Sequence, residues 1–172
     1  AANALNQAEL IAATSGAELI LNALNPPYAR WQSEVLLMGR NVIATAKAHQ
    51  ARHLFIGNVY NYGTSIPAQV TPDTPFQADP SLGKLRVELE DIFKIAAQEQ
   101  GVQTLILRAG DFYGAGQGSW FDQGILREIN KHKFSYSADW NLPHAWAYLP
   151  DLANAFVALA QQAEHLPAFE QY

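Results

Sequence analysis

Several common features are missing from this 172-residue chain, and each absence excludes a class of protein. There is no cysteine, which excludes a disulfide framework and a thiolate metal site. Lysine and arginine number 11 against 16 aspartates and glutamates, a net charge of −5, and there is no basic run, so we expect no nucleic-acid partner. No apolar stretch is long enough to cross a bilayer and no signal-peptide pattern is visible. We therefore expect no membrane partner and a cytoplasmic location.

Charge and metal ligands are also scarce. Charged residues make up 16% of the chain, against about 25% in typical domains. The five histidines show no metal-ligand spacing, and His49 and His53 straddle a predicted break between helix and strand. The sequence therefore predicts no metal site. The length predicts one domain over residues 1–172.

Apolar runs and helical periodicities alternate along the chain. The runs predict buried strands over residues 18–24, 54–56 and 102–107, and the periodicities predict long helices over 31–49 and 82–100. Such βαβ crossovers are right-handed, and they favour an α/β fold with a doubly wound parallel sheet and helices on both faces.

Shorter elements complete the expectation. Asn6 and Glu9 have the spacing of a capping box, which predicts a short helix after Asn6. Ser119 and Asp122 predict a helix that ends near Asn130. Residues 133–137 are expected to form a short strand, and Pro150 to lie in the first turn of a last helix.

The loop that follows the second strand offers ligand-binding groups. Residues 53–63 pass from an apolar run into a segment that holds Asn58, Tyr60 and Tyr62. In open α/β sheets the ligand crevice lies beyond the carboxyl ends of the strands. The alternative is a tyrosine-rich turn that only closes the strand.

Four segments carry a recognisable pattern in a fixed order. They are Asn-Ala-Leu-Asn at 22–25, Val-Tyr-Asn-Tyr-Gly at 59–63, Leu-Arg-Ala-Gly-Asp-Phe-Tyr-Gly at 107–114 and Tyr-Leu-Pro-Asp-Leu-Ala at 148–153. Together they resemble the extended short-chain dehydrogenase/reductases, the NAD-dependent epimerase/dehydratase family. The resemblance covers essentially the whole chain and implies a Rossmann-like fold.

The resemblance also implies ligands and residues that bind them. NAD or NADP would be the cofactor, and a small hydroxy or keto compound or a nucleotide sugar the substrate. The cofactor-binding positions would be Asn25, Pro26, Arg86, Ala109 and Gly110. The substrate-binding positions would be Asp111, His144 and Trp146. Family members commonly form homodimers through the two long helices, here residues 31–49 and 82–100.

The sequence departs from the family at two places. The glycine-rich pyrophosphate loop, which follows the family's first strand, is absent, so we expect an incomplete sheet that lacks the N-terminal strands. The family's Tyr-x-x-x-Lys falls on Leu82 and Arg86. Leucine cannot act as a general acid or base, and arginine keeps the charge with a different geometry.

These departures leave several interpretations open. The family's Ser/Thr position falls on Asn58, or on Gly57 if the gap is placed differently. Tyr60 or Tyr62 could replace the missing tyrosine beside Arg86 or Lys84. The alternative roles are packing or ligand stacking for the tyrosines and a surface position for Arg86. Asp111 could instead cap a turn, and His144 could simply be packed.

The activity is open as well. The favoured function is an NAD(P)-binding epimerase/dehydratase-like oxidoreductase with a degenerate Tyr-x-x-x-Lys site. The alternatives are a non-catalytic dinucleotide-binding sensor or scaffold, or a fragment that requires its missing N-terminal half.

Overall fold

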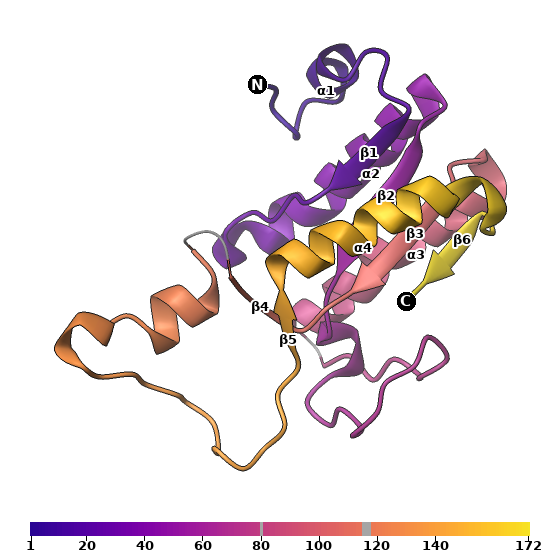
Figure 1. The fold of residues 1–172 in the computed structure, drawn as a ribbon. Helices are drawn as coiled ribbons and strands as arrows, with labels where there is room; N and C mark the ends of the chain where they lie inside the picture. Colours follow the sequence, from indigo (N-terminus) through magenta and orange to yellow (C-terminus); the bar gives the residue numbers. More distant parts are fainter. Residues whose placement is uncertain (80, 115–117) are drawn as a thin grey trace. The chain divides into compact units, whose positions relative to one another are not determined.

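The fold is described from a computed structural model that covers residues 1–79, 81–114 and 118–172 (Figure 1). These residues form two compact units. The sheet unit comprises Ala1–Arg108 and Ala160–Tyr172, and the second unit comprises Ala109–Leu159. The expectation of a single domain over residues 1–172 stays a prediction.

A four-stranded parallel sheet is the framework of the sheet unit. Its strands are β1 (Leu19–Asn22), β2 (Arg52–Gly57), β3 (Thr104–Arg108) and β6 (Phe169–Gln171), in the order β1-β2-β3-β6. All three pairings are parallel. The α/β fold with a parallel sheet flanked by helices is therefore confirmed. Strand β6 was not expected.

Strand β1 is less buried than its apolar sequence suggests. We expected a buried strand over residues 18–24, but Leu21 is 48% exposed and Asn22 is the only buried residue of β1. The reason is its position, since β1 pairs only with β2 in the described sheet. An edge strand has fewer neighbours to cover its side chains.

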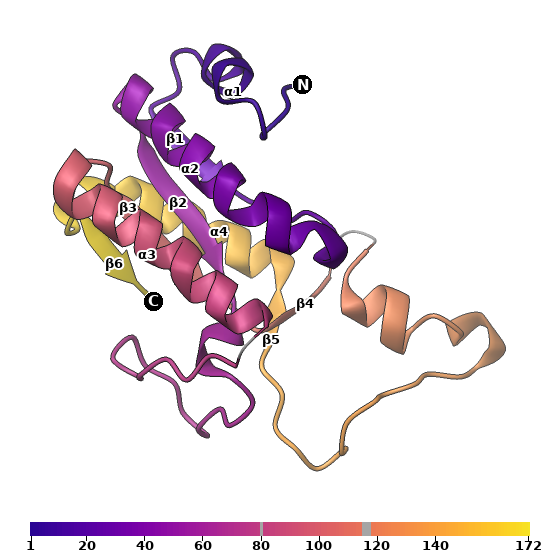
Figure 2. The same cartoon turned by 180° about the vertical axis from the view of Figure 1, so that it is seen from behind.

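The two long helices match the expectation residue for residue. Helix α2 spans Trp31–His49 and helix α3 spans Leu82–Gln100. Each ends where a residue adopts the left-handed conformation, Gln50 after α2 and Gly101 after α3, which is a common C-terminal cap. The two helices lie side by side against the sheet (Figure 2).

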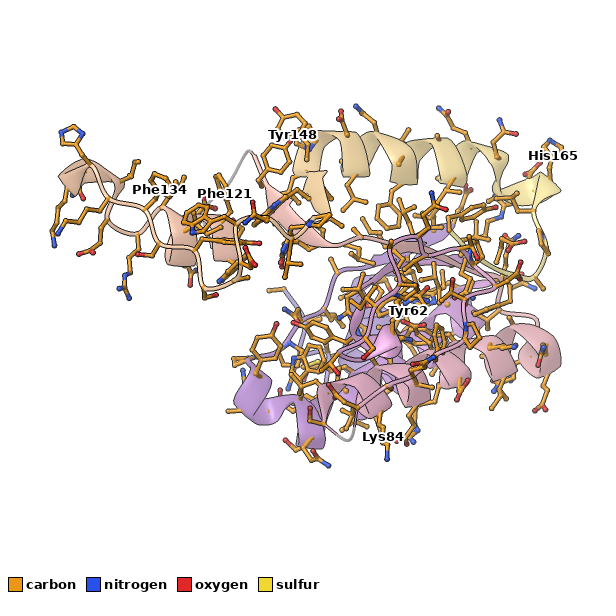
Figure 3. The ribbon with its side chains drawn as sticks, turned by 90° about the horizontal axis from the view of Figure 1, so that it is seen from below. Tyr62, Lys84, Phe121, Phe134, Tyr148 and His165 are labelled. Atoms are coloured by element: carbon orange, nitrogen blue, oxygen red, sulfur yellow. The ribbon has the colours of Figure 1, made fainter. Side chains whose placement is uncertain are left out.

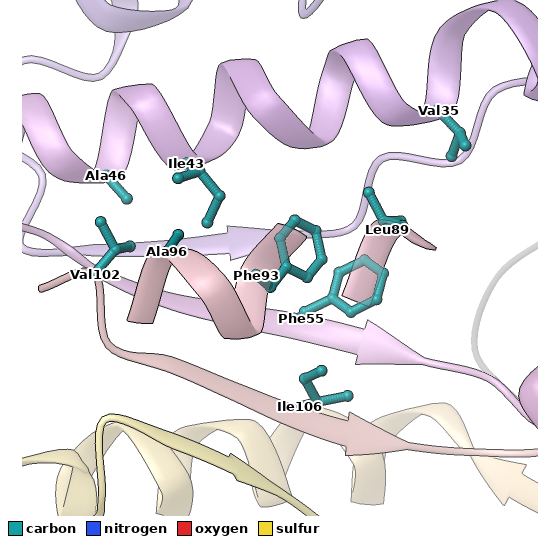
Figure 4. Packing of buried hydrophobic residues seen from close by; sticks show 9 residues of the cluster. All are labelled: Val35, Ile43, Ala46, Phe55, Leu89, Phe93, Ala96, Val102 and Ile106. Atoms are coloured by element: carbon teal, nitrogen blue, oxygen red, sulfur yellow. The ribbon is translucent and has the colours of Figure 1, made fainter. Parts of the chain in front are cut away.

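The core lies where α2 and α3 meet β2 and β3. Its centre is an edge-to-face pair formed by Phe55 and Phe93, with ring centroids 4.9 Å apart. The cluster is buried throughout and draws on both helices, both strands and the turn before β3; it comprises Val35, Ile43, Ala46, Phe55, Leu89, Phe93, Ala96, Val102 and Ile106 (Figure 4). The apolar stripes predicted for the helices therefore face the sheet, as a parallel sheet requires.

A short helix precedes β1. Helix α1 spans Gln7–Ala13 and packs against α2. The Asn6 side chain accepts a hydrogen bond from the backbone N–H of Glu9 at 3.2 Å, and its amide donates to the Glu9 carboxylate at 2.9 Å. The predicted helix start at Asn6 is confirmed.

The described residues of the second unit form two short strands, two helical turns and most of one helix. Strand β4 (Asp111–Tyr113) pairs in parallel with β5 (Trp146–Tyr148). Helix α4 (Leu149–Gln162) follows, and Pro150 lies in its first turn as expected. Among the described residues of both units, no helix is long and apolar enough to span a membrane.

Two expectations for the second unit are wrong. The predicted helix from Ser119 begins correctly, since Ser119 Oγ accepts from the Asp122 N–H at 3.2 Å. It is then divided into a π-helical turn over Phe121–Ile125 and a 3-10 turn over Ile129–Lys131. Residues 133–137 form no strand, because the aromatic side chains in this segment pack against other rings instead of alternating across a sheet.

Candidate functional site

The loop after β2 is held in place by its own asparagine. The Asn58 side-chain oxygen accepts from the Tyr60 N–H at 3.1 Å, and the chain then forms a 3-10 turn over Tyr60–Tyr62. Gly83, in the first turn of α3, lets this turn approach closely, since a Cβ there would lie 2.6 Å from the Tyr60 carbonyl oxygen. The Asn58 side chain therefore positions Tyr60.

The Tyr60 phenol pairs with a second phenol. Its oxygen lies 2.7 Å from that of Tyr28, which precedes α2. Tyr28 is 57% exposed, and both rings lie against Trp31, with centroids 5.1 and 6.1 Å away. The pair is a short hydrogen-bonded chain that connects a partly buried hydroxyl with the surface.

Arg86 is buried beside this pair. Only 7% of the residue is exposed, and its guanidinium lies over the rings of Trp31 and Phe55, 5.3 and 4.8 Å from their centroids. One long bond joins Nη2 to the Ile56 carbonyl oxygen at 3.4 Å. Nε and Nη1 have no hydrogen-bond partner among the described residues. Two donor nitrogens of a buried cation are therefore left without an acceptor among the described residues, which is uncommon for buried polar groups.

The electrostatics couple Arg86 to both phenols. Burial lowers the pKa of Arg86, and the Glu90 carboxylate opposes this, as do the phenols of Tyr60 and Tyr28 when ionised. An arginine stays protonated in proteins. The positive charge of Arg86 therefore lies within electrostatic range of both phenols.

A second arginine fixes the base of the loop. Arg108 donates two parallel bonds to Glu90, at 3.0 and 2.8 Å, and a third to the Asn58 carbonyl oxygen at 2.9 Å. The side chains of the ion pair are only 7% and 4% exposed. Glu90 also accepts from the Asn61 amide at 2.9 Å. This buried network holds both ends of residues 58–61 against α3 and β3.

Tyr62 has a different environment from Tyr60. It is 2% exposed and packs edge-on against Phe76, with centroids 5.6 Å apart. Burial raises the pKa of Tyr62, while Arg108 opposes and Glu90 reinforces the shift. Figure 3 places it among the side chains of the sheet unit. Its hydroxyl is poorly suited to exchange a proton with a ligand.

The other predicted cofactor positions of the sheet unit are Asn25 and Pro26. The Pro26 carbonyl oxygen accepts from the Trp31 indole at 2.8 Å, and Asn25 beside it is exposed. Leu82 is the first residue of α3. Lys84, in the same turn, is exposed and points away from the sheet unit (Figure 3). It is therefore unsuited to replace the buried Arg86.

The second unit brings its three predicted substrate residues together. Asp111 in β4 is in register with Trp146 in β5, and its carboxylate lies 2.7 Å from His144 Nε2. His144 stacks on Trp146 with centroids 4.5 Å apart. Gly110 allows this approach, because a Cβ there would lie 2.1 Å from the Ala145 carbonyl oxygen. Ala109 is the first residue of the unit.

Sequence reasoning missed three residues of these two clusters. Tyr28 was overlooked because it follows two prolines and carries no motif. The Trp120 and Tyr136 rings pack with centroids 5.8 Å apart and planes tilted by 48°, in the segment whose elements were predicted wrongly. Their common signal is an aromatic-rich composition between β4 and β5, which a search for strands misreads. No group of three or more possible metal ligands occurs among the described residues.

Arg86 provides a structural test of whether a dinucleotide fits. Its two unpartnered donors lie in a buried, ring-lined setting beside the carboxyl end of β2, where α/β folds bind ligands. Ribose hydroxyls and phosphates are acceptors that such donors satisfy. The residues present at this edge therefore fit the ribose part of a nicotinamide dinucleotide.

Solved structures of low sequence identity share this fold. A UDP-glucose 4-epimerase from Brucella ovis in complex with NAD superposes with a TM-score of 0.82 at 13% identity, over 98% of this chain and 61% of that chain. A GDP-mannoheptose C4 reductase from Campylobacter jejuni with NADP bound gives 0.73 at 16%, over 92% and 61%. A dTDP-glucose 4,6-dehydratase from Streptomyces venezuelae gives 0.80 at 13%, over 99% and 55%.

This chain spans about three-fifths of the length of these solved structures. The sequence comparisons identify the family. No curated protein matches the chain by sequence. The model of the NAD dependent epimerase/dehydratase family matches residues 4–172, nearly the whole chain, and this chain belongs to that family.

Proposed function

We propose that this chain is an NAD(P)-binding oxidoreductase of the epimerase/dehydratase type, which acts on a small hydroxy or keto compound or a nucleotide sugar. The observation that carries the proposal is the buried Arg86 with two unpartnered donors beside the Tyr28–Tyr60 pair. A dinucleotide bound here would supply the hydride chemistry, and Arg86 would hold its ribose.

Tyr60 is the proton-transfer residue in this proposal. Its phenol lies in the electrostatic field of Arg86, and its hydrogen bond to the exposed Tyr28 offers a path for the proton to solvent. Asn58 holds the Tyr60 backbone and could donate its amide to a substrate oxygen. Tyr62 is less suitable because burial raises its pKa.

Calorimetric titration with NADH and with NADPH tests the binding step. We expect the chain to bind at least one of them. The variant Arg86→Met keeps an apolar stem between Trp31 and Phe55 and should lower the affinity about tenfold or more, the cost of a lost charged hydrogen bond. The control Lys84→Met removes an exposed charge from the same turn and should change it less than twofold. No binding by a folded chain would overturn the proposal.

Turnover of the bound cofactor with a panel of carbonyl compounds tests the chemistry. We expect Tyr60→Phe to lower the rate about 100-fold or more, as loss of a general acid does. Tyr62→Phe should lower it much less. Equal losses in both variants, or none, would contradict the assignment of Tyr60.

The non-catalytic alternative rests on Leu82, which lacks an ionisable proton at the family's tyrosine position. A sensor or scaffold would bind NADH or NADPH without turning over any carbonyl compound. The fragment alternative predicts no binding until a second polypeptide supplies the glycine-rich loop.

A homodimer through α2 and α3 and a cytoplasmic location stay part of the proposal. Leu37 in α2 is 43% exposed and Ile95 in α3 is 48% exposed, so apolar surface is available on both helices. Sedimentation should give a dimer at micromolar concentration, and a monomer would contradict this part.

A further inference from the structure

A chain of three polar side chains runs through the second unit. His144 Nε2 lies 2.7 Å from the Asp111 carboxylate, and His144 Nδ1 lies 3.1 Å from the Tyr136 hydroxyl. Asp111 comes from β4, Tyr136 from the segment 133–145, and His144 from just before β5. The three residues are thus brought together by the fold.

The hydrogen-bond chemistry gives this chain a direction. An ionised carboxylate can only accept, so Nε2 carries the proton and donates to Asp111. In a neutral imidazole the other nitrogen then has a lone pair. His144 Nδ1 therefore accepts from the Tyr136 O–H. This is the order acid, imidazole, hydroxyl that makes the hydroxyl a proton-transfer group or a nucleophile.

Aromatic rings hold the imidazole in this orientation. His144 packs beside Trp146 and Trp120, with centroids 4.5 and 5.8 Å away and planes 27° and 25° from parallel, and the two indoles also stack on each other with centroids 5.6 Å apart. The Tyr136 ring in turn lies against Trp120 and Trp140, 5.8 and 5.4 Å away. Two stacked indoles restrict rotation of the imidazole, and the carboxylate fixes its tautomer.

The cluster is open to ligands. The Asp111 side chain is 45% exposed and that of His144 is 30% exposed. Trp140 and Phe134 are 67% and 59% exposed and pack edge to face (Figure 3 labels Phe134). Exposed ring faces beside polar groups suit a ligand with an apolar face and oxygen substituents, such as a sugar ring.

We propose that Asp111, His144 and Tyr136 form a proton relay through which Tyr136 removes or returns a proton on a carbon next to a carbonyl group. The Tyr136 oxygen forms a bond to the substrate proton while its own proton passes to His144 Nδ1. The electron pair of the broken C–H bond becomes that of the enolate, and Asp111 stabilises the imidazolium. The reverse steps restore the relay. No oxidant or reductant is required.

This inference rests on the proposed function for its substrate, because a keto group acidifies the neighbouring C–H bonds. It adds a second acid–base site to that of Tyr60. Within the second unit, Tyr136 serves a carbon proton. Epimerisation and dehydration of a keto sugar both need such a group.

Acetylation by N-acetylimidazole tests the relay without any cofactor or substrate. In the reaction, the tyrosine oxygen bonds to the acetyl carbon, imidazole leaves, and the phenol loses its proton. The intact chain is acetylated and then digested, and mass spectrometry of the peptides gives the acetylation rate at each tyrosine. Tyr113 and Tyr148 are internal references, since they lie in the same unit and are 38% and 41% exposed.

We expect the Tyr136 rate at pH 7 to exceed those references about tenfold or more, because a general base assists the reaction. The acetylation rate of Tyr136 should change with pH in parallel with the protonation of His144, which is measured by NMR. An ordinary tyrosine becomes faster up to about pH 10, where its phenol ionises. His144→Phe keeps the ring stack and should return Tyr136 to ordinary behaviour. The control His132→Asn changes an exposed histidine of the same unit and should have no effect.

A Tyr136 profile that matches Tyr113 and Tyr148, or a fast rate that survives His144→Phe, would overturn the inference. Failure of dinucleotide binding would leave this result unchanged, because the assay contains no dinucleotide. The two proposals therefore fail independently.

Discussion

The two units of the molecule are stabilised in different ways. In the sheet unit, α2, α3, β2 and β3 enclose a buried aliphatic and aromatic core. In the second unit, Ile125 and Phe156 are the only buried apolar side chains among the described residues, and stacked aromatic rings take their place. A buried core gives rigidity, whereas partly exposed rings leave ligand-facing surface. Substitutions in the sheet unit and hydrogen exchange in both units can test this contrast.

The largest effect should come from the buried ion pair of the sheet unit. Glu90→Ala removes the carboxylate that binds Arg108 and Asn61, and a buried arginine would remain without its partner. We expect a loss of about 3–5 kcal/mol in the free energy of unfolding, measured by urea denaturation. The control Glu88→Ala, at an exposed position of the same helix, should change it by less than about 0.5 kcal/mol. Similar values for both variants would contradict the role of the network.

Native-state hydrogen exchange compares the two units directly. The amides of Leu54 and Phe55 in β2, which pairs on both sides, should exchange on the order of 100-fold more slowly than those of Phe112 in β4 and Ala147 in β5. The ratio corresponds to about 2.7 kcal/mol. Equal protection would show that the second unit opens only together with the sheet unit.

His53 should make the sheet unit sensitive to acid. It is completely buried beside the Phe55–Phe93 pair, and burial lowers its pKa to about 3. The unfolded chain binds this proton below a pH of about 6.5, and the native state does not until about pH 3. Stability is therefore full above pH 6.5 and decreases as the pH falls through this window, by about 2 kcal/mol at pH 5.

The substitution His53→Phe isolates this contribution. The difference between the free energies of unfolding at pH 7 and pH 5 should shrink by about 2 kcal/mol. His132→Asn, at an exposed position, should leave most of that difference in place. An unchanged pH dependence in His53→Phe would show that another group causes the acid sensitivity.

The sheet unit was also the part that its sequence predicted best. Helices α2 and α3 carry long apolar stripes, and their bounds agree residue for residue. Strand β6 was missed because Phe169–Gln171 is three residues long and has one apolar side chain. A short strand was expected over residues 133–137, but Phe134 packs against Trp140 instead. Contacts between aromatic rings leave no periodic pattern in a sequence, so the segment between β4 and β5 could not be predicted in this way.

The candidate site residues divide into those that the family resemblance marks and those that it does not. Asn58, Tyr60 and Arg86 were found because the family motifs mark them, and His144 and Asp111 for the same reason. Tyr28 and Tyr136, which complete the two hydrogen-bonded chains, lie outside every motif. The Tyr28–Tyr60 contact joins residues 32 positions apart in the sequence, and the Tyr136–His144 contact lies within an irregular loop. Sequence can locate such residues only once their partners are placed.

The smallest effect should come from Gly83, where the packing of one helix meets the site. Replacing glycine by alanine inside a helix normally raises the free energy of unfolding by about 1 kcal/mol. Here the added Cβ would lie 2.6 Å from the Tyr60 carbonyl oxygen. A backbone atom cannot move aside as easily as the end of a side chain can. Gly83→Ala should therefore lower the free energy of unfolding by about 1 kcal/mol and also weaken turnover, because it displaces the turn that carries Tyr60. A stabilised variant with full turnover would show that the turn adapts freely and that the position of Tyr60 is not set by α3.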